Sequence, residues 1–337
     1  MRARNLAVLA VLANGCSGST GAAPTDGGAN SDAAPPDAAA DAAVPDGALP
    51  DAASSRGFPV SGPWVSFYGT AAEMGDLAKV AATFRVINLD ADPDGANFTA
   101  AQIQQLRAGG QNRVISYLNL GSCEMFRSYW STAPAGLVSC SANTAAQLGP
   151  YQGYPDEVWM NLGDADYQNL ILQHVAPRLA SMGVDGFFLD NLELVEHGTA
   201  TSDGPCDPAC SQGGLDLVRK LREKFPALLI VMQNATSDRT RLGSTGGLPY
   251  PSLLDGISHE EVYVPPDSTA QGELAAWRGL GLTPGGRPFW IATEDYVGSC
   301  TATSSAQGAY DQSRDAGFSP YATDQSAGQR VVCYWPF

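Results

Sequence analysis

Acidic residues lie where they could carry out catalysis, directly after apolar, β-rich runs. Asp190 follows the run VDGFFL, and Glu260 and Glu261 follow the run LDGISH. Both runs are typical of buried strands, and parallel α/β barrels carry their catalytic side chains at the carboxyl ends of the strands. Asp190 alone could instead cap a following helix. The ends of the other predicted strands decide between these two interpretations.

Polar side chains follow the other predicted strands as well. They are Tyr68, Asp90, Asn119, Glu124, Gln233, Asn234, Glu294 and Asp295, and Glu193 lies shortly after Asp190. In a closed barrel of parallel strands, these positions all face one mouth. Helix capping accounts for one or two such residues but not for a whole ring. The pattern therefore predicts an active site.

Carboxyl groups beside aromatic rings indicate sugar chemistry. Two carboxyl groups that flank a glycosidic bond act as acid and as nucleophile or base, and flat aromatic faces stack against sugar rings. The aromatic candidates are Tyr68, Tyr117, Trp130, Trp159, Tyr263 and Trp290. Each of them could equally be a core residue. The chain has no GxSxG or HExxH motif and three histidines, so we expect neither a metal site nor a cofactor.

Strand-like and helical patterns alternate along the chain. The predicted strands cover residues 64–69, 85–90, 113–121, 184–190, 227–235, 254–263, 288–296 and 318–323. The predicted helices cover residues 73–84, 99–110, 166–183, 213–225, 268–281 and 308–317. Pro177 predicts a kink or break in the third of these. The alternation, without a GxGxxG motif, favours an α/β fold of the (β/α)8 TIM-barrel type over an open doubly wound sheet.

The first residues resemble an export signal. Residues 1–16 have a basic start, a short apolar run and small residues before Cys16, as in bacterial lipoprotein signals, which attach lipid to such a cysteine. Ala13 stands where these signals usually carry leucine, so a plain secretory signal is the alternative. Residues 17–56, rich in alanine, proline and aspartate, predict a disordered tether. We expect an exported or surface-bound protein whose single folded domain covers residues 57–337 and touches the membrane only through the lipid.

Cysteine content and charge agree with export. Without Cys16 six cysteines remain, and an even number in an exported chain indicates disulfides. The expected pairs are Cys123–Cys140, Cys206–Cys210 and Cys300–Cys333, although the sequence alone allows other pairings. The net charge of −16 argues against a nucleic-acid partner. We expect a monomer.

Four stretches of the chain resemble glycoside hydrolase family 114, the endo-α-1,4-polygalactosaminidases and their relatives. They are ISYLNLGSCEMFRSYW, YQGYPDEVWMNL, GVDGFFLDNLE and LDGISHEEVY, in the order seen in that family. The resemblance extends over nearly all of residues 64–335. It implies a (β/α)8 barrel that cleaves a galactosamine-containing exopolysaccharide, with Asp190 and Glu260 as the catalytic pair.

Further side chains are expected to bind the polysaccharide. They are Tyr68, Asp90, Tyr117, Glu124, Arg127, Glu157, Trp159, Glu193, Tyr263 and Glu294. The chain departs from the family at Glu193, where an aspartate is frequent, and at Asn161, where an acidic residue is frequent. These departures leave the identity of the glycan open. A hydrolase of another glycan and a barrel that binds polysaccharide without cleaving it are the alternatives.

The two carboxyl groups have different expected roles. Asp190 attacks the anomeric carbon or activates the water that does, and Glu260 donates a proton to the leaving oxygen. Glu260 must then be protonated when the substrate binds, which requires burial or a like-charged neighbour such as Asp190. Glu261 is adjacent, but strand alternation points neighbouring side chains in opposite directions, so only one can face the cleft. The spacing from Asp255 favours Glu260.

Overall fold

The computed structural model describes residues 62–281, 289–325 and 329–337. The expected signal peptide, Cys16 and the tether over residues 17–56 lie outside the described residues, as does the beginning of the expected domain at residues 57–61. Within the described ranges no helix combines the length and the apolar character needed to cross a membrane.

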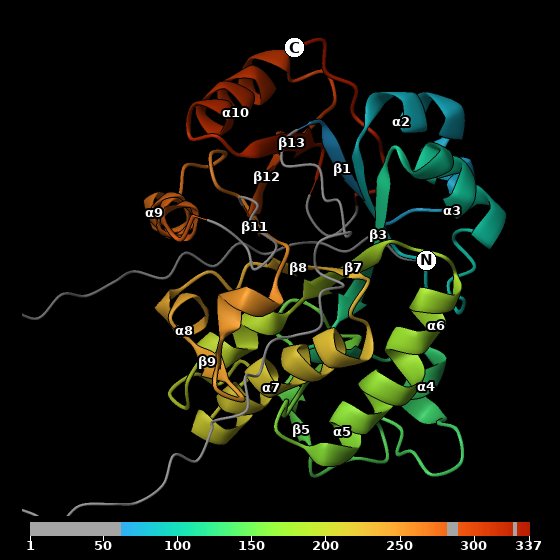
Figure 1. Ribbon diagram of the computed structural model, residues 1–337, viewed down its shortest axis with the longest axis vertical. Coiled ribbons are helices and arrows are strands. Elements are labelled where there is room, and N and C mark those ends of the chain that lie inside the picture. Colours follow the sequence, from blue (N-terminus) through green and yellow to red (C-terminus); the bar gives the residue numbers. More distant parts are fainter. Residues whose placement is uncertain (1–61, 282–288, 326–328) are drawn as a thin grey trace, which may run out of the picture. The chain divides into compact units, whose positions relative to one another are not determined.

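Eight parallel strands form the barrel that the sequence predicts (Figure 1). In order around the barrel they are β1 (Trp64–Phe67), β2 (Val86–Leu89), β3 (Arg113–Asn119), β7 (Gly186–Asp190), β8 (Leu229–Gln233), β11 (Gly256–Glu260), β12 (Trp290–Tyr296) and β13 (Ser319–Thr323). Most are buried over nearly their whole length, as strands covered on both faces are. The first and last strands meet where the Trp64 indole nitrogen donates to the Ser319 carbonyl oxygen (2.9 Å).

Helices follow the strands and lie around the barrel (Figure 1). The longer ones are α2 (Leu77–Thr83), α3 (Ala100–Arg107), α7 (Pro208–Lys224), α9 (Ser268–Gly279) and α10 (Thr303–Asp315). The short ones are α1 (Ala71–Met74), α4 (Ser128–Ser131), α8 (Asp238–Arg241), η2 (Ala108–Gly110), η4 (Leu192–Glu196) and η5 (Tyr250–Leu253). Carboxylates that accept hydrogen bonds from free N–H groups mark the starts of α2 (Asp76) and α7 (Asp207).

The helix expected over residues 166–183 is irregular, as Pro177 predicts. Helix α5 (Ala165–Leu170) passes into a π-helical turn, η3 (Ile171–Val175), and then into α6 (Ala176–Ser181). Pro177 lies in the first turn of α6, directly after the turn in which the hydrogen-bond pattern changes. Proline lacks the N–H group that a regular helix needs, and π turns are a common way to accommodate such a break.

A small antiparallel sheet lies between β3 and β7, where the sequence predicts no strands. It consists of β4 (Ser122–Glu124), β6 (Glu157–Met160) and β5 (Gln147–Pro150). These strands are short, and β4 and β6 are buried at every position, so they show no alternation of polar and apolar residues. The two-residue strands β9 (Ser244–Thr245) and β10 (Leu248–Pro249) were not expected for the same reason of length.

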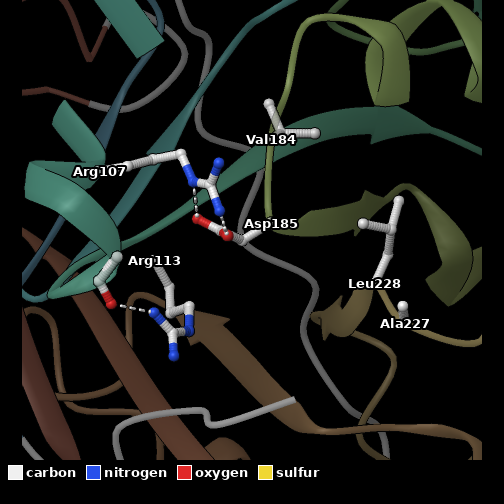
Figure 2. A pocket seen from close by; sticks show the side chains of 7 residues that line it. Arg107, Arg113, Val184, Asp185, Ala227 and Leu228 are labelled. Atoms are coloured by element: carbon white, nitrogen blue, oxygen red, sulfur yellow. Dashed lines mark hydrogen bonds and ion pairs between the residues drawn. The ribbon is translucent and has the colours of Figure 1, made fainter. Parts of the chain in front are cut away.

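The aspartate that precedes β7 fastens the amino ends of the strands. Asp185 accepts hydrogen bonds from the Arg107 guanidinium (2.6 and 3.0 Å) and from the backbone N–H of Val114 on β3 (2.9 Å). Figure 2 shows this ion pair beside a pocket of about 400 Å³. In VDGFFLD the first aspartate is therefore structural, because it lies at the end of the barrel opposite to Asp190. In barrels of this type, residues at the amino ends of the strands contribute to stability rather than to catalysis.

The same arrangement recurs before β11. Asp255 accepts a hydrogen bond from the Arg222 guanidinium (2.6 Å) and another from the backbone N–H of Ile230 on β8 (2.9 Å). The Arg222 side chain is almost fully buried, so this charge is neutralised where water cannot reach it. The two aspartates thus bind neighbouring strands to each other at equivalent positions.

All three disulfides expected from the sequence are present. Cys123–Cys140, Cys206–Cys210 and Cys300–Cys333 join positions separated by 17, 4 and 33 residues. The first ties β4 to the loop beyond α4, and the third ties the loop after β12 to the C-terminal segment. The cross-links therefore hold parts of the chain that the barrel strands do not contain.

Removing the disulfides one pair at a time should lower the free energy of unfolding in the order of their loop lengths. A cross-link restricts the unfolded chain more when its loop is longer, which gives losses of about 4 kcal/mol for Cys300–Cys333, about 3 for Cys123–Cys140 and about 2 for Cys206–Cys210. Urea denaturation of the three paired Cys→Ser variants measures these losses. A larger loss for Cys206–Cys210 than for Cys300–Cys333 would contradict the loop-entropy argument.

Candidate active site

The expected catalytic carboxylates lie at the carboxyl ends of two barrel strands. Asp190 is the last residue of β7 and pairs in register with Asn119 on β3. Glu260 is the last residue of β11 and pairs in register with Glu294 on β12. Parallel strands direct these ends to the same mouth, so the barrel brings together residues that are far apart in sequence.

Residues in the left-handed backbone conformation directly follow three neighbouring strands at this mouth. Asn191, Asn234 and Glu261 directly follow β7, β8 and β11 and have φ angles of +58°, +60° and +53°. Asparagine tolerates this conformation, whereas glutamate rarely adopts it. The chain thus turns sharply after each strand, and the last strand residue is left facing the barrel mouth.

Glu260 accepts hydrogen bonds from three side chains. The Asn234 amide donates to Oε2 (3.0 Å), while the Gln329 amide (3.2 Å) and the Tyr296 hydroxyl donate to Oε1. Asn234 also accepts a hydrogen bond from the Glu260 backbone N–H (3.0 Å). These donors contact both carboxyl oxygens and fix the orientation of the Glu260 side chain.

Glu261 points elsewhere. It is exposed, and its backbone N–H donates to the Glu294 carbonyl oxygen (2.8 Å). The left-handed turn that contains it separates its side chain from the donors around Glu260. Of the two adjacent glutamates, Glu260 is the one that faces the partners inside the mouth.

Asp190 and Glu193 form an acidic pair beside Glu260. Burial raises the pKa of Asp190 well above its usual range, and the charges of Glu193 and Glu260 raise it further. Burial likewise raises the pKa of Glu193 to about 8, with Glu260 adding to the effect. Glu193 Oε2 is buried without a hydrogen-bond partner among the described residues. Near neutral pH this pair therefore holds protons that exposed carboxyl groups would have released.

Glu294 lies beside Glu260, as its register partner on the neighbouring strand. Its side chain is fully buried, and neither carboxyl oxygen makes a hydrogen bond of normal geometry within the described ranges. Burial raises the pKa of Glu294 well above its usual range, and the charge of Glu260 is the next largest cause. Glu294 is thus a carboxyl group whose charged form is disfavoured, and it does not lie on an open surface.

Glu157 is held in a hydrogen-bonded cluster beside Asp190. Its Oε2 accepts from the Ser122 hydroxyl (2.6 Å) and from the side-chain amides of Asn119 (3.2 Å) and Asn191 (3.3 Å). Gly121 makes this cluster possible, because a Cβ atom there would lie 1.8 Å from the carbonyl oxygen of Asn191. The close approach of the two loops fixes the turn that follows Asp190.

Arg127 joins Glu124 and Asp90 in a separate buried network. Its guanidinium donates to Glu124 Oε2 (2.8 Å) and to Asp90 Oδ2 (3.2 Å). Burial raises the pKa of Glu124 to about 7, although the Arg127 charge opposes that rise. Arg178 continues the network by pairing with Asp92 (2.5 Å). Both arginines are therefore already paired, and they are outnumbered by the carboxyl groups around them, which include Asp94.

The expected aromatic residues divide into two groups. Tyr68 and Tyr117 contact each other edge to face (5.2 Å between ring centroids), and burial together with Asp190 raises the pKa of each. Trp159 is buried: its ring stacks on Tyr151 (4.0 Å) and its indole nitrogen donates to Asp203 (2.6 Å). Trp159 therefore supports another ring rather than offering a face of its own.

Tyr263 lies apart from the carboxylate pair. Its backbone N–H donates to Asp295 (2.7 Å), and burial followed by the charge of Asp295 raises its pKa to about 12. Trp290 is a core residue, with its ring edge to face against Trp64 (5.4 Å). For Trp290 the core interpretation holds.

Three residues of the site were not singled out from the sequence. Tyr151 has its pKa raised mainly by burial and then by Glu193 and Asp190, which places it beside the acidic pair. Tyr296 and Gln329 both contact Glu260. Tyr151 lies in the stretch YQGYPDEVWM, which could have indicated it, whereas Gln329 lies 69 residues from Glu260 with no signal around it.

Within the described residues, no group of three or more histidine, cysteine, aspartate or glutamate side chains is arranged to hold a metal ion.

Comparison with known proteins identifies the fold and the family. Residues 52–217 match the model of glycoside-hydrolase family GH114. These residues, close to half of the chain, belong to this family. The match supports a glycoside hydrolase, an enzyme whose substrate is a glycan. The matched residues of this GH114 domain include Asp190 and Glu193 but end before Glu260.

Several proteins resemble this GH114 domain. An uncharacterized protein of Deinococcus radiodurans is 25% identical over 252 residues, which cover 72% of this chain and 73% of the relative. The glycoside hydrolase domain of PelA from Pseudomonas aeruginosa has a TM-score of 0.58 at 16% identity, covering 80% of this chain and 96% of that domain. Aspergillus fumigatus Ega3, solved in complex with galactosamine, has a TM-score of 0.57 at 15% identity, covering 83% and 96%. At these identities the two structures show the shared fold.

Replacing Glu193 with glutamine should stabilise the protein more at pH 8 than at pH 5. The pKa of Glu193 is raised to about 8 in the folded state, so folding requires proton uptake and the free energy of unfolding falls as the pH rises from about 4 to 8. The glutamine side chain of the variant does not ionise, so its burial does not lower the stability as the pH rises. We expect Glu193→Gln to gain at least about 1 kcal/mol at pH 8.

Chemical denaturation at both pH values measures this difference. Glu223→Gln is the control, because Glu223 lies exposed on α7 and should show no comparable dependence on pH. A Glu193→Gln variant that gains equally at pH 5 would refute the electrostatic explanation.

Proposed function

We propose that this protein is an endo-acting glycoside hydrolase that cleaves α-1,4-linked polymers containing galactosamine, with Asp190 and Glu260 as its catalytic carboxyl groups. One observation carries the proposal. Asp190, Glu193 and Glu260 lie close enough to influence one another's ionisation, yet within the described ranges no lysine, arginine or histidine forms an ion pair with any of them.

A cationic substrate would supply the missing charge. Several buried carboxyl groups without a counter-charge are unfavourable, because each must either lose its solvation or keep its proton. The free amine of galactosamine is protonated near neutral pH and would pair with them. The fold shared with Ega3, which was solved with galactosamine, supports this substrate class.

Asp190 and Glu260 work as one unit that shares a proton. In the empty site burial together with Glu193 favours a proton on Asp190, and the donors around Glu260 hold its carboxyl group in place. An ammonium group bound beside Asp190 and Glu193 would favour ionised Asp190 and leave the shared proton to Glu260. Asp190 then acts on the anomeric carbon, directly or through water, while Glu260 protonates the leaving oxygen.

The surrounding residues complete the cleft. Tyr151, stacked on buried Trp159, is proposed to face a sugar ring, and the Arg127 network is proposed to bind hydroxyl groups further along the polymer. The three disulfides support an oxidising compartment. Attachment to a membrane through Cys16 is part of the same proposal.

Conservative replacement of either carboxyl group should abolish most activity. Asp190→Asn and Glu260→Gln keep the shape of the side chain but remove its ionisable group, so turnover should fall by at least about 10²-fold. Thermal melting should change little, because neither residue forms an ion pair that the fold depends on. Reducing-sugar release from the polymer measures the loss.

Glu261→Gln is the matched control and should keep most activity, since Glu261 is exposed and turned away from the Glu260 donors. Full activity in both Asp190→Asn and Glu260→Gln would overturn the assignment of the catalytic pair. Binding of the polymer without cleavage by the unmodified chain would favour the alternative of a binding protein.

Deacetylated galactosamine polymer should be cleaved faster than its fully acetylated counterpart. Acetylation removes the positive charge of the substrate amine, which would otherwise pair with Asp190 and Glu193. We therefore expect a decrease of at least about tenfold in kcat/KM. Product sizing should show oligosaccharides rather than single sugars. Equal rates on both polymers, or cleavage of a neutral glycan alone, would refute the amino-sugar specificity.

A further inference from the structure

The C-terminal segment brings one buried side chain against the proposed catalytic Glu260. The Gln329 amide nitrogen lies 3.2 Å from Glu260 Oε1 and 2.9 Å from the Tyr296 hydroxyl, which itself donates to the same oxygen. Gln329 is 2% exposed. These three groups form a closed triangle of hydrogen bonds around one carboxyl oxygen.

A second chain of hydrogen bonds fixes which way the Gln329 amide faces. The Asn88 amide donates to the Ser66 hydroxyl (3.0 Å), and that hydroxyl donates to Gln329 Oε1 (2.6 Å). Because the Ser66 hydroxyl uses its hydrogen on the Gln329 oxygen, the Gln329 nitrogen must face Glu260. Strands β1 and β2 thus orient a donor that reaches the end of β11.

The backbone of Gln329 is also held in position. Its φ angle is +33°, which non-glycine residues seldom adopt. Its carbonyl oxygen accepts a hydrogen bond from the backbone N–H of Tyr68 (2.9 Å), directly after β1. Residues held in such conformations occur preferentially at functional sites, because the surrounding contacts must maintain them.

One disulfide holds both donors of Glu260 Oε1. Tyr296 is followed four residues later by Cys300, and Gln329 is followed four residues later by Cys333. Cys300 and Cys333 are bonded to each other. The cross-link therefore joins the loop after β12 to the C-terminal segment just beyond the two side chains that converge on Glu260.

We propose that Gln329 is a positioning residue for Glu260, and that the Cys300–Cys333 disulfide keeps Gln329 and Tyr296 together on that carboxyl group. This inference rests on the proposed function, since it assigns Glu260 to catalysis. Gln329 aims the Glu260 carboxyl group across the mouth by donating to one of its oxygens.

Gln329→Leu removes the donor and keeps a side chain of similar size. Without that hydrogen bond the charged form of Glu260 is less stable, so Glu260 should take up its proton at a pH about one unit higher. The limb of the kcat/KM profile that Glu260 controls should move by the same amount. We expect kcat to fall about tenfold, with KM changing less.

The experiment uses the full, oxidised chain with two readouts. A ¹³C NMR titration follows the Glu260 carboxyl group, assigned with Glu260→Gln, and the pH profile of polymer cleavage follows catalysis. Gln329→Asn, which keeps an amide on a shorter side chain, should lie between the unmodified chain and Gln329→Leu. Gln312→Leu is the control, because Gln312 lies exposed on α10 and bonds only to the Gly308 carbonyl oxygen in its own helix.

The outcomes separate the two proposals. If the unmodified chain cleaves no galactosamine polymer, the proposed function fails, while the NMR titration still decides the role of Gln329. A folded Gln329→Leu variant whose Glu260 titration and pH profile match those of the unmodified chain would overturn the positioning role.

The disulfide has its own test. Cys300→Ser/Cys333→Ser, or selective reduction of that bond if the variant does not fold, should move the Glu260 titration in the same direction as Gln329→Leu. Cys206→Ser/Cys210→Ser should leave it in place. An unchanged titration without the Cys300–Cys333 bond would overturn the role of the disulfide, even if Gln329 itself proves necessary.

Discussion

The burial of like-charged carboxyl groups at one mouth of the barrel is the constraint on which the rest of this structure depends. Burial and mutual repulsion raise the pKa of Asp190, Glu193 and Glu294. A group in this state destabilises the folded protein as the pH rises through its titration range. The interactions that stabilise the fold must therefore lie outside the site.

The stabilising interactions lie at the opposite end of the strands and outside the barrel. Asp185 with Arg107 and Asp255 with Arg222 bind adjacent strands at their amino ends. The disulfides cross-link segments that the parallel ladder leaves free. This division follows from the architecture, because one end of a (β/α)8 barrel is available for function while the other serves stability.

Much of the fold and part of the site follow from the sequence, for identifiable reasons. Each barrel strand is an apolar run followed by polar residues, so its position and its carboxyl end, including those of Asp190 and Glu260, are visible in the chain. Short strands such as β4 give no such pattern. The sequence could not show that Trp159 is buried beneath Tyr151, because the identity of a residue does not reveal which faces of its ring are covered in the fold. Gln329 could not be found at all, since only the folded chain places it beside a residue 69 positions away.

The position of Gln329 shows why a closed barrel suits a site of this kind. The segment after β13 passes the point where the first and last strands meet, and there it bonds both to Ser66 on β1 and to Glu260 at the end of β11. The same residue therefore contacts a strand that begins the barrel and completes the hydrogen bonds of the proposed catalytic carboxyl group. A chain that lacked this segment could still form every strand of the sheet, yet its Glu260 would keep only the donors from Asn234 and Tyr296. The geometry of the acid thus depends on the last part of the chain as much as on the strand that carries it.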